Sequence, residues 1–299
     1  MSSIDVWNGE HMDYIDLDGK LVKEDTSQDR LLKYLYTNPF GRMLLKPLVM
    51  PGISKLSGYL LSSFTSRHLI KTFIKKEGID MSDFPTRRYR SFNDFFTRKI
   101  TDGARPIDPD ENTLISPCDC RCSVYPIMED STFQIKHTEY TLRSLLHSRK
   151  LAKKFQGGYI YILRLTVKDY HRYVYAASGE QGKTYRINGS FHTVNPVAND
   201  YLPIYKENTR EYTLLRTESF GNVLQMEVGA LLVGKISNHK DRCYAVRGEE
   251  KGFFEYGGST IVVITEPNKI KPRSDLLENT AEGLETRLLQ GHAIGCAVE

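Results

Sequence analysis

The spacing of hydrophobic and polar residues changes about a third of the way along the chain. From Arg30 to Lys76 apolar residues recur at intervals of three and four, which predicts two or three amphipathic helices. Prolines and glycine interrupt the pattern near 38–39 and 50–52, where we expect the helices to break. Residues 1–28 are polar and acidic with few periodic apolar positions, and are predicted to form an irregular lead-in.

Beyond a short predicted helix at 92–99, alternation typical of strands dominates, and only Tyr140–Phe155 is strongly helical. The polar tail from Ile270 is expected to lie on the surface. Helices followed by strands predict an α+β chain: an N-terminal helical segment and a mostly antiparallel β-rich domain, divided as 1–28, 29–90 and 91–299. The predicted strands are Leu114–Ser116, Ser123–Ile127, Tyr159–Val167, Arg172–Ala176, Leu214–Thr217, Val223–Val228, Leu231–Ile236 and Thr260–Thr265.

The charge of the helical segment suggests a partner. Residues 30–76 contain nine Lys or Arg and no Asp or Glu. A basic amphipathic helix suits an anionic membrane surface, because apolar burial and attraction to lipid headgroups add together. An ordinary helical subdomain, with its apolar stripe packed on the rest of the protein, explains the pattern equally well. No uncharged apolar run reaches 18 residues, so we expect no transmembrane helix.

Composition narrows the class of protein. Hydrophobic residues make up 40% and charged residues 26%, which allows a packed core. The net charge of +4 is too small to indicate nucleic acid as a partner. Cys118, Cys120 and Cys122 lie close together in a chain with five cysteines, unlike a secreted disulfide framework, and fit a reducing compartment. Their alternation places them on one side of a strand as reduced thiols, and we expect no metal site.

A Gly257-Gly258-Ser259 sequence joins two predicted strands. Two glycines in such a place normally form a hairpin turn. A serine hydroxyl can also attack the carbonyl of the preceding residue when that peptide is held in a strained geometry, which glycine tolerates. The resulting ester can eliminate, which breaks the chain and leaves a pyruvoyl group. That carbonyl can form an imine with a substrate amine and accept electrons as carbon dioxide leaves.

Two further residues could carry chemistry. His171 follows the strand predicted at 159–167, where a histidine can move protons near neutral pH. Asp119 lies at a predicted junction between a strand and a turn. Taken alone, each has an ordinary explanation: a structural histidine, and an acid that forms a turn.

Taken in order, these motifs resemble the phosphatidylserine decarboxylase family, pyruvoyl enzymes that process themselves at a Gly-Ser bond. The resemblance extends from about Tyr36 to the tail. It is carried by Phe92-Asn-Asp-Phe-Phe-Thr-Arg-Lys, Ala104-Arg-Pro-Ile, Ser116-Pro-Cys-Asp, Asp169-Tyr-His-Arg-Tyr, Gly189-Ser with Val194-Asn-Pro, Glu207-Asn-Thr-Arg, Val228-Gly-Ala with Val233-Gly, and Lys251-Gly-Phe-Phe-Glu-Tyr-Gly-Gly-Ser-Thr.

The resemblance implies cleavage between Gly258 and Ser259, giving chains 1–258 and 259–299 that stay together. Ser259 would become the pyruvoyl group, and phosphatidylserine would be converted to phosphatidylethanolamine and carbon dioxide. Asp119 matches the acid that activates the serine with a histidine, and His171 matches a histidine that binds substrate and protonates the product. The enzyme would sit peripherally on the cytoplasmic face of an anionic membrane. Whether it is a homodimer is left open.

Two positions depart from the family pattern. Val174 stands where a second histidine, usually assigned to self-cleavage, is common, and Cys120 replaces a glycine. Either His171 serves both stages, or His192 or His239 substitutes by folding back, or processing is impaired. Two alternatives therefore stay open: a pyruvoyl decarboxylase acting on a soluble amino acid, and an unprocessed relative that binds lipid.

Overall fold

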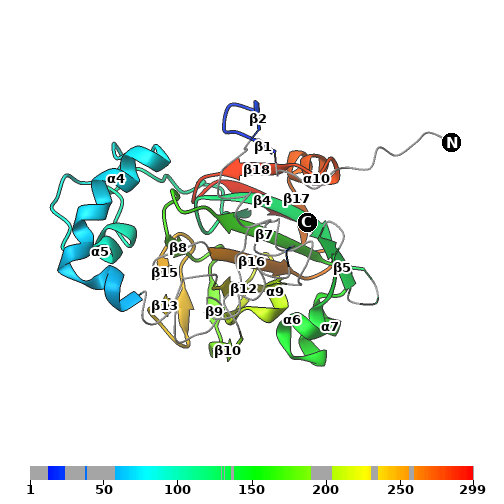
Figure 1. Ribbon diagram of the computed structural model, residues 1–299. Helices are drawn as coiled ribbons and strands as arrows, with labels where there is room; N and C mark the ends of the chain where they lie inside the picture. The colour runs from blue at the N-terminus through cyan, green and yellow to red at the C-terminus, as the bar shows by residue number, and fades with distance from the viewer. Residues whose placement is uncertain are drawn as a thin grey trace.

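A computed structural model describes residues 13–23, 38, 58–128, 130, 132–135, 138–189, 204–229, 235–255 and 259–298. An eleven-stranded sheet forms the centre of the molecule, in the order β14-β9-β11-β12-β16-β7-β4-β18-β1-β2, with β10 paired to β11 (Figure 1). Its strands are β1 (Tyr14–Ile15), β2 (Leu21–Val22), β4 (Cys120–Pro126), β7 (Tyr159–Leu165), β9 (Gly179–Gln181), β10 (Tyr185–Ile187), β11 (Arg210–Arg216), β12 (Asn222–Val228), β14 (Cys243–Ala245), β16 (Ser259–Thr265) and β18 (Glu285–Leu288).

Three smaller sheets accompany it, in the orders β13-β15-β8, β17-β19-β3 and β5-β6. Their strands are β3 (Thr113–Ile115), β5 (Thr132–Ile135), β6 (Thr138–Thr141), β8 (Arg172–Val174), β13 (Ile236–Asn238), β15 (Glu250–Phe254), β17 (Ile270–Pro272) and β19 (Ala293–Ala297). Of the pairings in the described residues, only that of β1 with β18 is parallel. The predicted α+β class with mostly antiparallel strands is confirmed.

The helices lie at the edges of this β structure. They are η1 (Phe64–Arg67), α4 (His68–Glu77), α5 (Phe92–Phe96), α6 (Leu142–Leu146), α7 (Arg149–Phe155), α9 (Ile204–Glu207) and α10 (Ser274–Ala281), with a further helical turn at 58–62. In Figure 1, α4 and α5 flank the β8-β15-β13 sheet on the side away from the large sheet. They pack around their own cluster of apolar side chains, formed by Ile70, Ile79, Phe92, Phe95 and Phe96.

Most of the predicted elements are confirmed. The helix at 92–99 is α5, and the helical region at 140–155 is α6 and α7, separated where His147 adopts a positive φ of 50°. The predicted strands appear as β3, β4, β7, β8, β11, β12 and β16, with ends that differ by a few residues. The helices predicted in 30–57 and most of the strand at 231–236 fall outside the described residues. Within the lead-in, β1 and β2 form a short hairpin on the large sheet.

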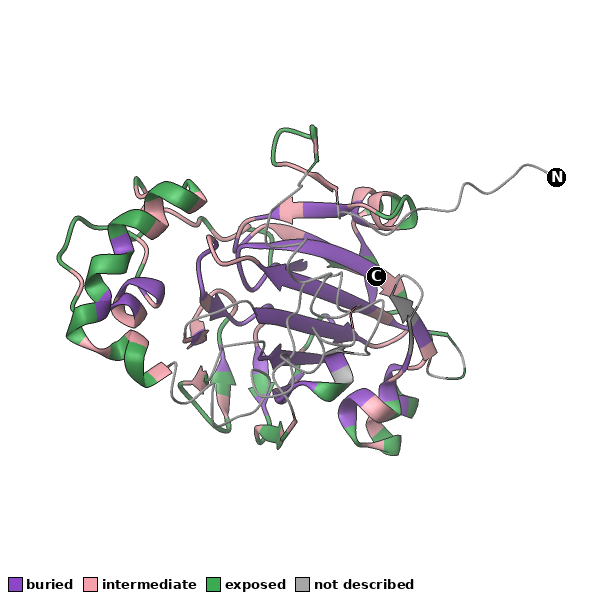
Figure 2. Cartoon of the chain, viewed as in Figure 1, coloured by how far each residue is buried: buried purple, intermediate pink, exposed green. Residues whose placement is uncertain are grey.

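The core lies on both faces of the large sheet. All seven residues of β16 are buried (Figure 2). They are buried because one cluster of apolar side chains covers each face of the sheet. Val262 and Ile264 face one cluster, whereas Ile261 and Val263 face the other. A strand covered on both sides favours apolar residues at successive positions, which explains the uninterrupted apolar sequence 261–264.

The expectation that the tail lies on the surface is wrong. The tail provides β18, which pairs with β4 inside the large sheet, and Leu276, Leu288 and Ile294 are buried. Glu285 of β18 is also buried, where it forms an ion pair with Arg164 of β7. Charged residues that pair inside the structure explain why a polar sequence belongs to the core.

The hairpin interpretation of the Gly257-Gly258 sequence is also wrong. β15 pairs with β8 and β13 in a small sheet, whereas β16 pairs with β7 and β12 in the large sheet. The intervening residues 256–258 lie outside the described ranges. The strands on either side of the Gly-Ser bond therefore belong to two different sheets.

Candidate active site

Ser259 is the first residue of β16, and its side chain is completely buried. By strand alternation it shares a sheet face with Ile261 and Val263. That is the face covered by the cluster containing Cys118, Cys120 and Phe254. Its Oγ forms no hydrogen bond with any described residue. A buried hydroxyl without a partner costs free energy, so its presence calls for an explanation.

Strand register relates Ser259 to Asp119. Ser259 pairs with Leu165 of β7, and on the other side of β7 Arg164 pairs with Arg121 of β4. Asp119 immediately precedes β4, so it lies at the same end of the sheet as Ser259 but two strands away. Two strand spacings amount to about 10 Å, which is too far for direct contact between the side chains.

His171 is carried by the loop that leaves the strand between them. This loop runs from the end of β7 to His171, just before β8. The histidine is fully buried, and its ring lies 4.0 Å, centroid to centroid, from that of Phe96 on α5. Its Nδ1 lies 2.9 Å from the carbonyl oxygen of Asp169. Because a carbonyl only accepts, Nδ1 carries a hydrogen; when the ring is neutral, the lone pair is therefore on Nε2.

The backbone of His171 connects it to the strand that leads to Ser259. Its carbonyl accepts a hydrogen bond of 3.0 Å from the N–H of Phe254, the last residue of β15. Three residues further on, the N–H of Val174 donates to the carbonyl of Pro117 at 2.9 Å. β8 thus contacts both the segment before Ser259 and the turn that holds Asp119.

Asp119 is held by an arginine that the sequence analysis did not single out. Arg105 donates to both carboxylate oxygens, with Nε 2.9 Å from Oδ1 and Nη2 2.7 Å from Oδ2. The backbone N–H of Gln290 also donates to Oδ1, at 2.9 Å. Among the described residues none of the hydrogen bonds of Asp119 goes to His171 or Ser259. Arg105 belongs to the Ala104-Arg-Pro-Ile motif, and this motif was the signal that could have identified it.

Buried polar contacts attach the β8-β15-β13 sheet to the large sheet. Lys251 of β15 lies 2.8 Å from Glu227 of β12, and both side chains are almost completely buried. Gln225, also on β12, donates from its side chain to the carbonyl of Val174 and accepts from the N–H of Ala176. These contacts fix the position of His171 relative to β16, because β12 is the immediate neighbour of β16.

Residues of the tail complete the site. The side-chain amide of Gln290 donates to the carbonyls of Pro117 and Arg172, at 3.2 and 3.0 Å. Arg287 forms an ion pair with Asp169, which is buried. Burial raises the pKa of Asp169, but the charge of Arg287 and the hydrogen bonds from Thr166 outweigh it, so the net pKa is lowered. No motif marked these tail residues in the sequence.

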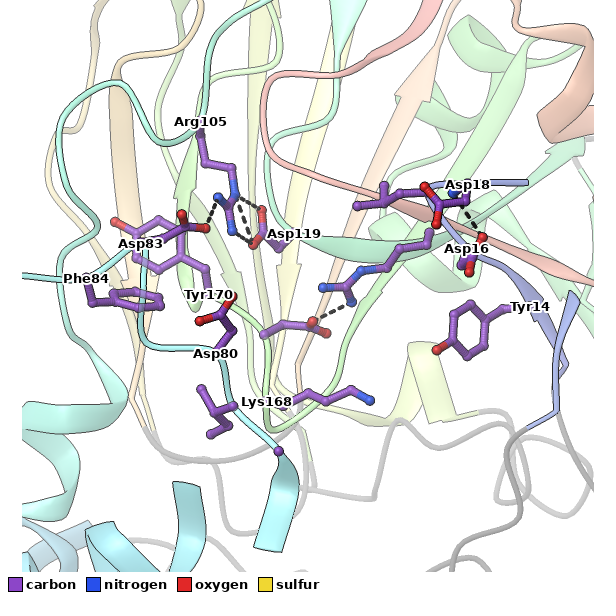
Figure 3. Close-up of a pocket in the computed structure, with 15 residues that line it drawn as sticks. Tyr14, Asp16, Asp18, Asp80, Asp83, Phe84, Arg105, Asp119, Lys168 and Tyr170 are labelled. Carbon is purple, nitrogen blue, oxygen red and sulfur yellow. Dashed lines mark hydrogen bonds and ion pairs between the residues drawn. The ribbon is translucent and has the colours of Figure 1, made fainter. Parts of the chain in front are cut away.

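A cavity of about 500 Å³ opens beside Asp119 (Figure 3). Arg105 spans it between Asp83 and Asp119. The acidic residues of its lining outnumber the cationic ones, so the cavity favours a cationic or amine-bearing group over an anion. The acids are Asp16, Asp18, Asp80, Asp83, Asp119 and Asp169, and the cations are Arg105, Lys168 and Arg287.

The remaining predicted residues lie apart from this arrangement. His239 is partly exposed, and its Nε2 lies 2.6 Å from Glu250. His192 and Gly258 are outside the described residues. Cys118, Cys120 and Cys122 are free, fully buried and part of one apolar cluster, as their spacing predicts. Burial raises the pKa of the Cys118 and Cys122 thiols.

Comparison with known proteins gives the class of protein. The family model for phosphatidylserine decarboxylase matches residues 92–295, which extend from α5 into β19. The chain therefore belongs to the phosphatidylserine decarboxylase family and is a decarboxylase. The resemblance noted in the sequence is thus confirmed.

Individual relatives cover nearly the whole chain. The phosphatidylserine decarboxylase proenzyme 2 of Clostridium acetobutylicum is 43% identical over 265 residues, 88% of this chain and 91% of the relative. The phosphatidylserine decarboxylase proenzyme of Fusobacterium nucleatum is 38% identical over 295 residues, 96% and 98% of the two chains. The phosphatidylserine decarboxylase proenzyme of Ruminiclostridium cellulolyticum is 40% identical over 282 residues, which cover 92% of this chain and 94% of the relative.

Proposed function

We propose that this enzyme converts phosphatidylserine to phosphatidylethanolamine and carbon dioxide, using a pyruvoyl group made from Ser259 by cleavage between residues 258 and 259. The names of the relatives support both the substrate and synthesis as a precursor. The observation that carries the proposal is the buried Oγ of Ser259, which has no hydrogen-bond partner among the described residues. Ser259 also begins a strand of the large sheet, whereas the strand before it in the chain, β15, belongs to a different sheet.

The surroundings of Ser259 fit a pyruvoyl group. The position is fully buried and held at the start of a central strand, so water is excluded and the group is fixed. Once formed, such a group supplies a carbonyl that accepts electrons as the carboxylate leaves the substrate. After cleavage, residues 259–299 would stay bound to the large chain through the pairing of β16 with β7 and β12 and of β18 with β4.

We assign the proton transfers to His171. Its Nε2 holds the lone pair, so it can take the proton of the Ser259 hydroxyl and later deliver one to the product carbon. Asp119, fixed by Arg105 and Gln290 at the same end of the sheet as Ser259, is assigned as the acid that assists this histidine. His171 would thus serve both stages, in a chain that has Val174 at the position of a second histidine.

The helical segment supports a peripheral membrane location. Four of its large apolar side chains are more than half exposed: Tyr59, Leu60, Phe64 and Leu69. η1 and α4 contribute four positive charges, from Arg67, Lys71, Lys75 and Lys76. Figure 2 shows that much of α4 is exposed. Within the described residues no helix is long and apolar enough to span a bilayer. The segment 29–90 would therefore form a membrane-docking unit beside the β-rich unit 91–299, and the reduced thiols favour the cytoplasmic face.

Membrane docking predicts a loss of vesicle binding when Leu60 and Phe64 are both replaced by glutamate. Burial of each apolar side chain in the membrane contributes roughly 1.5–3 kcal/mol. The fraction of the double variant that floats with vesicles of anionic lipid should therefore be at least tenfold lower than that of the wild type. Tyr244→Glu, at an exposed site on β14, is the control and should float normally. Normal flotation of the double variant would favour the ordinary packed subdomain.

Intact-mass spectrometry tests the proposed reaction. We expect two chains, 1–258 and 259–299, the second starting with a pyruvoyl group and lacking the nitrogen of Ser259. The same preparation should release carbon dioxide from phosphatidylserine and not from free serine. Release from serine alone would establish the soluble amino-acid alternative, and a single uncleaved inactive chain would establish the unprocessed relative.

A further inference from the structure

Arg98, directly after α5, is a buried cation without an ion-pair partner among the described residues. Its side chain is 2% exposed. The Cζ atom of its guanidinium lies 4.2 Å from the ring centroid of Phe84 and 4.6 Å from that of Phe95. Nη1 donates to the carbonyl of Phe95 at 3.3 Å, whereas Nε and Nη2 have no hydrogen-bond partner in the described residues. Burial lowers the pKa of Arg98 to about 10, so the group is still charged at pH 7. Such an arrangement is costly unless an anion completes it.

A second unused donor lies beside it. The hydroxyl of Tyr89 is buried and also has no hydrogen-bond partner within the described residues. The Tyr89 ring packs edge-on against Phe95, 5.3 Å between centroids, so Arg98 and Tyr89 contact the same ring. Two nitrogen donors of Arg98 and the hydroxyl of Tyr89, on side chains that contact the same ring, thus have no acceptor among the described residues. N–H and O–H donors are what an oxyanion requires.

The cavities on either side of Phe84 decide from which direction an anion arrives. Phe84 lines the acidic cavity beside Asp119 and also a second cavity of about 560 Å³ between α4 and the segment 81–89. The lining of this second cavity contains Arg67, Lys71, Arg87 and Arg88 and no acidic residue. An anion is therefore drawn toward the α4 side of Phe84, where Tyr89 also forms part of the wall.

Arg98 is also close to the chemistry. Phe96, two residues earlier, packs on His171, and the backbone carbonyl of Thr97 accepts a hydrogen bond from Arg172 at 2.9 Å. An anion bound at Arg98 would be positioned relative to the histidine through α5. We propose that Arg98 and Tyr89 form the site for the phosphodiester of the lipid substrate, reached from the cationic cavity beside α4 when the Phe84 ring turns aside. This inference rests on the proposed function.

The chemistry favours the phosphodiester over the carboxylate of the same headgroup. The carboxylate loses its charge during decarboxylation, so binding it to a buried cation would stabilise the ground state more than the transition state and slow the reaction. The phosphodiester keeps its charge throughout, so Arg98 can bind it without opposing catalysis.

The test compares two buried arginines. Arg210 is also buried with its pKa lowered to about 10, but it donates to the carbonyls of Leu145, Asn208 and Ser144. With dihexanoyl phosphatidylserine as a soluble substrate, Arg98→Met and Tyr89→Phe should raise KM, the former at least tenfold, with little change in kcat or in precursor cleavage. Arg98→Met should melt at or above the wild-type temperature, because an unpaired buried charge is removed. Arg210→Met should melt lower and keep the wild-type KM.

Calorimetry on uncleaved Ser259→Ala protein separates this inference from the proposed reaction. Glycerophosphoserine should bind at least tenfold more weakly once Arg98→Met is added, whether or not the wild type decarboxylates lipid. Unchanged affinity, or an unchanged KM in Arg98→Met, would overturn the assignment. Inorganic phosphate that binds at Arg98 more tightly than glycerophosphoserine would identify a site for free phosphate and would also overturn it.

Discussion

Replacement of Ser259 by alanine is expected to leave a single 34.3 kDa chain with no decarboxylase activity. Alanine fits the space at the start of β16, so the buried strand and its pairing should be kept. Without the hydroxyl no ester can form at the preceding carbonyl, and no carbonyl electrophile can be generated. A denaturing gel and an assay for released carbon dioxide measure both effects, which should be complete rather than partial.

The neighbouring residue provides a matched control. Thr260 is also fully buried, and its hydroxyl likewise has no hydrogen-bond partner among the described residues. It points to the opposite face of the sheet, so Thr260→Val removes a buried hydroxyl without touching the proposed nucleophile. This variant should be cleaved and active. An active Ser259→Ala enzyme would exclude the pyruvoyl mechanism.

Replacement of His171 by glutamine is expected to slow precursor cleavage by about 10²–10⁴-fold, the range typical of a general base. Glutamine can keep a hydrogen bond to the carbonyl of Asp169 but cannot take up a proton at neutral pH. Any cleaved fraction should show a similarly reduced kcat, because the same nitrogen is assigned to protonation of the product. A time course of cleavage after synthesis and a kcat normalised to the pyruvoyl content measure the two stages.

His239→Gln is the control for this prediction. His239 contacts Glu250 and Phe253, and it was one of the two histidines that the sequence left as substitutes. The variant should be cleaved and active at the wild-type level. If the His239→Gln precursor fails to cleave while the His171→Gln precursor cleaves normally, the proton transfers are assigned to the wrong histidine.

The sequence singled out the residues to which we assign the reaction, but not the residues that hold them in place. The ordered motifs identified the family and singled out Ser259, His171 and Asp119 as candidates, because each lies in a short motif with distinctive neighbours. Arg105 and Lys251 lie in those same motifs, but their partners lie elsewhere: Asp119 in the turn before β4, and Glu227 on β12. No local pattern records which charged residues will meet in the core.

By itself the sequence determined the family, the class of fold and the central strands β4, β7, β11, β12 and β16 of the large sheet, because strand periodicity and motif order are properties of neighbouring residues. Tertiary structure alone decided that the polar tail enters the core, since the charge of Glu285 is balanced there by Arg164 of another strand. It also decided that the Gly-Ser segment joins two sheets rather than forming a hairpin, because pairing of β16 with β7 and β12 buries its apolar residues on both faces. The burial of Arg98, which has no ion-pair partner among the described residues, has the same origin: it depends on the rings that α5 and Phe84 bring around the cation.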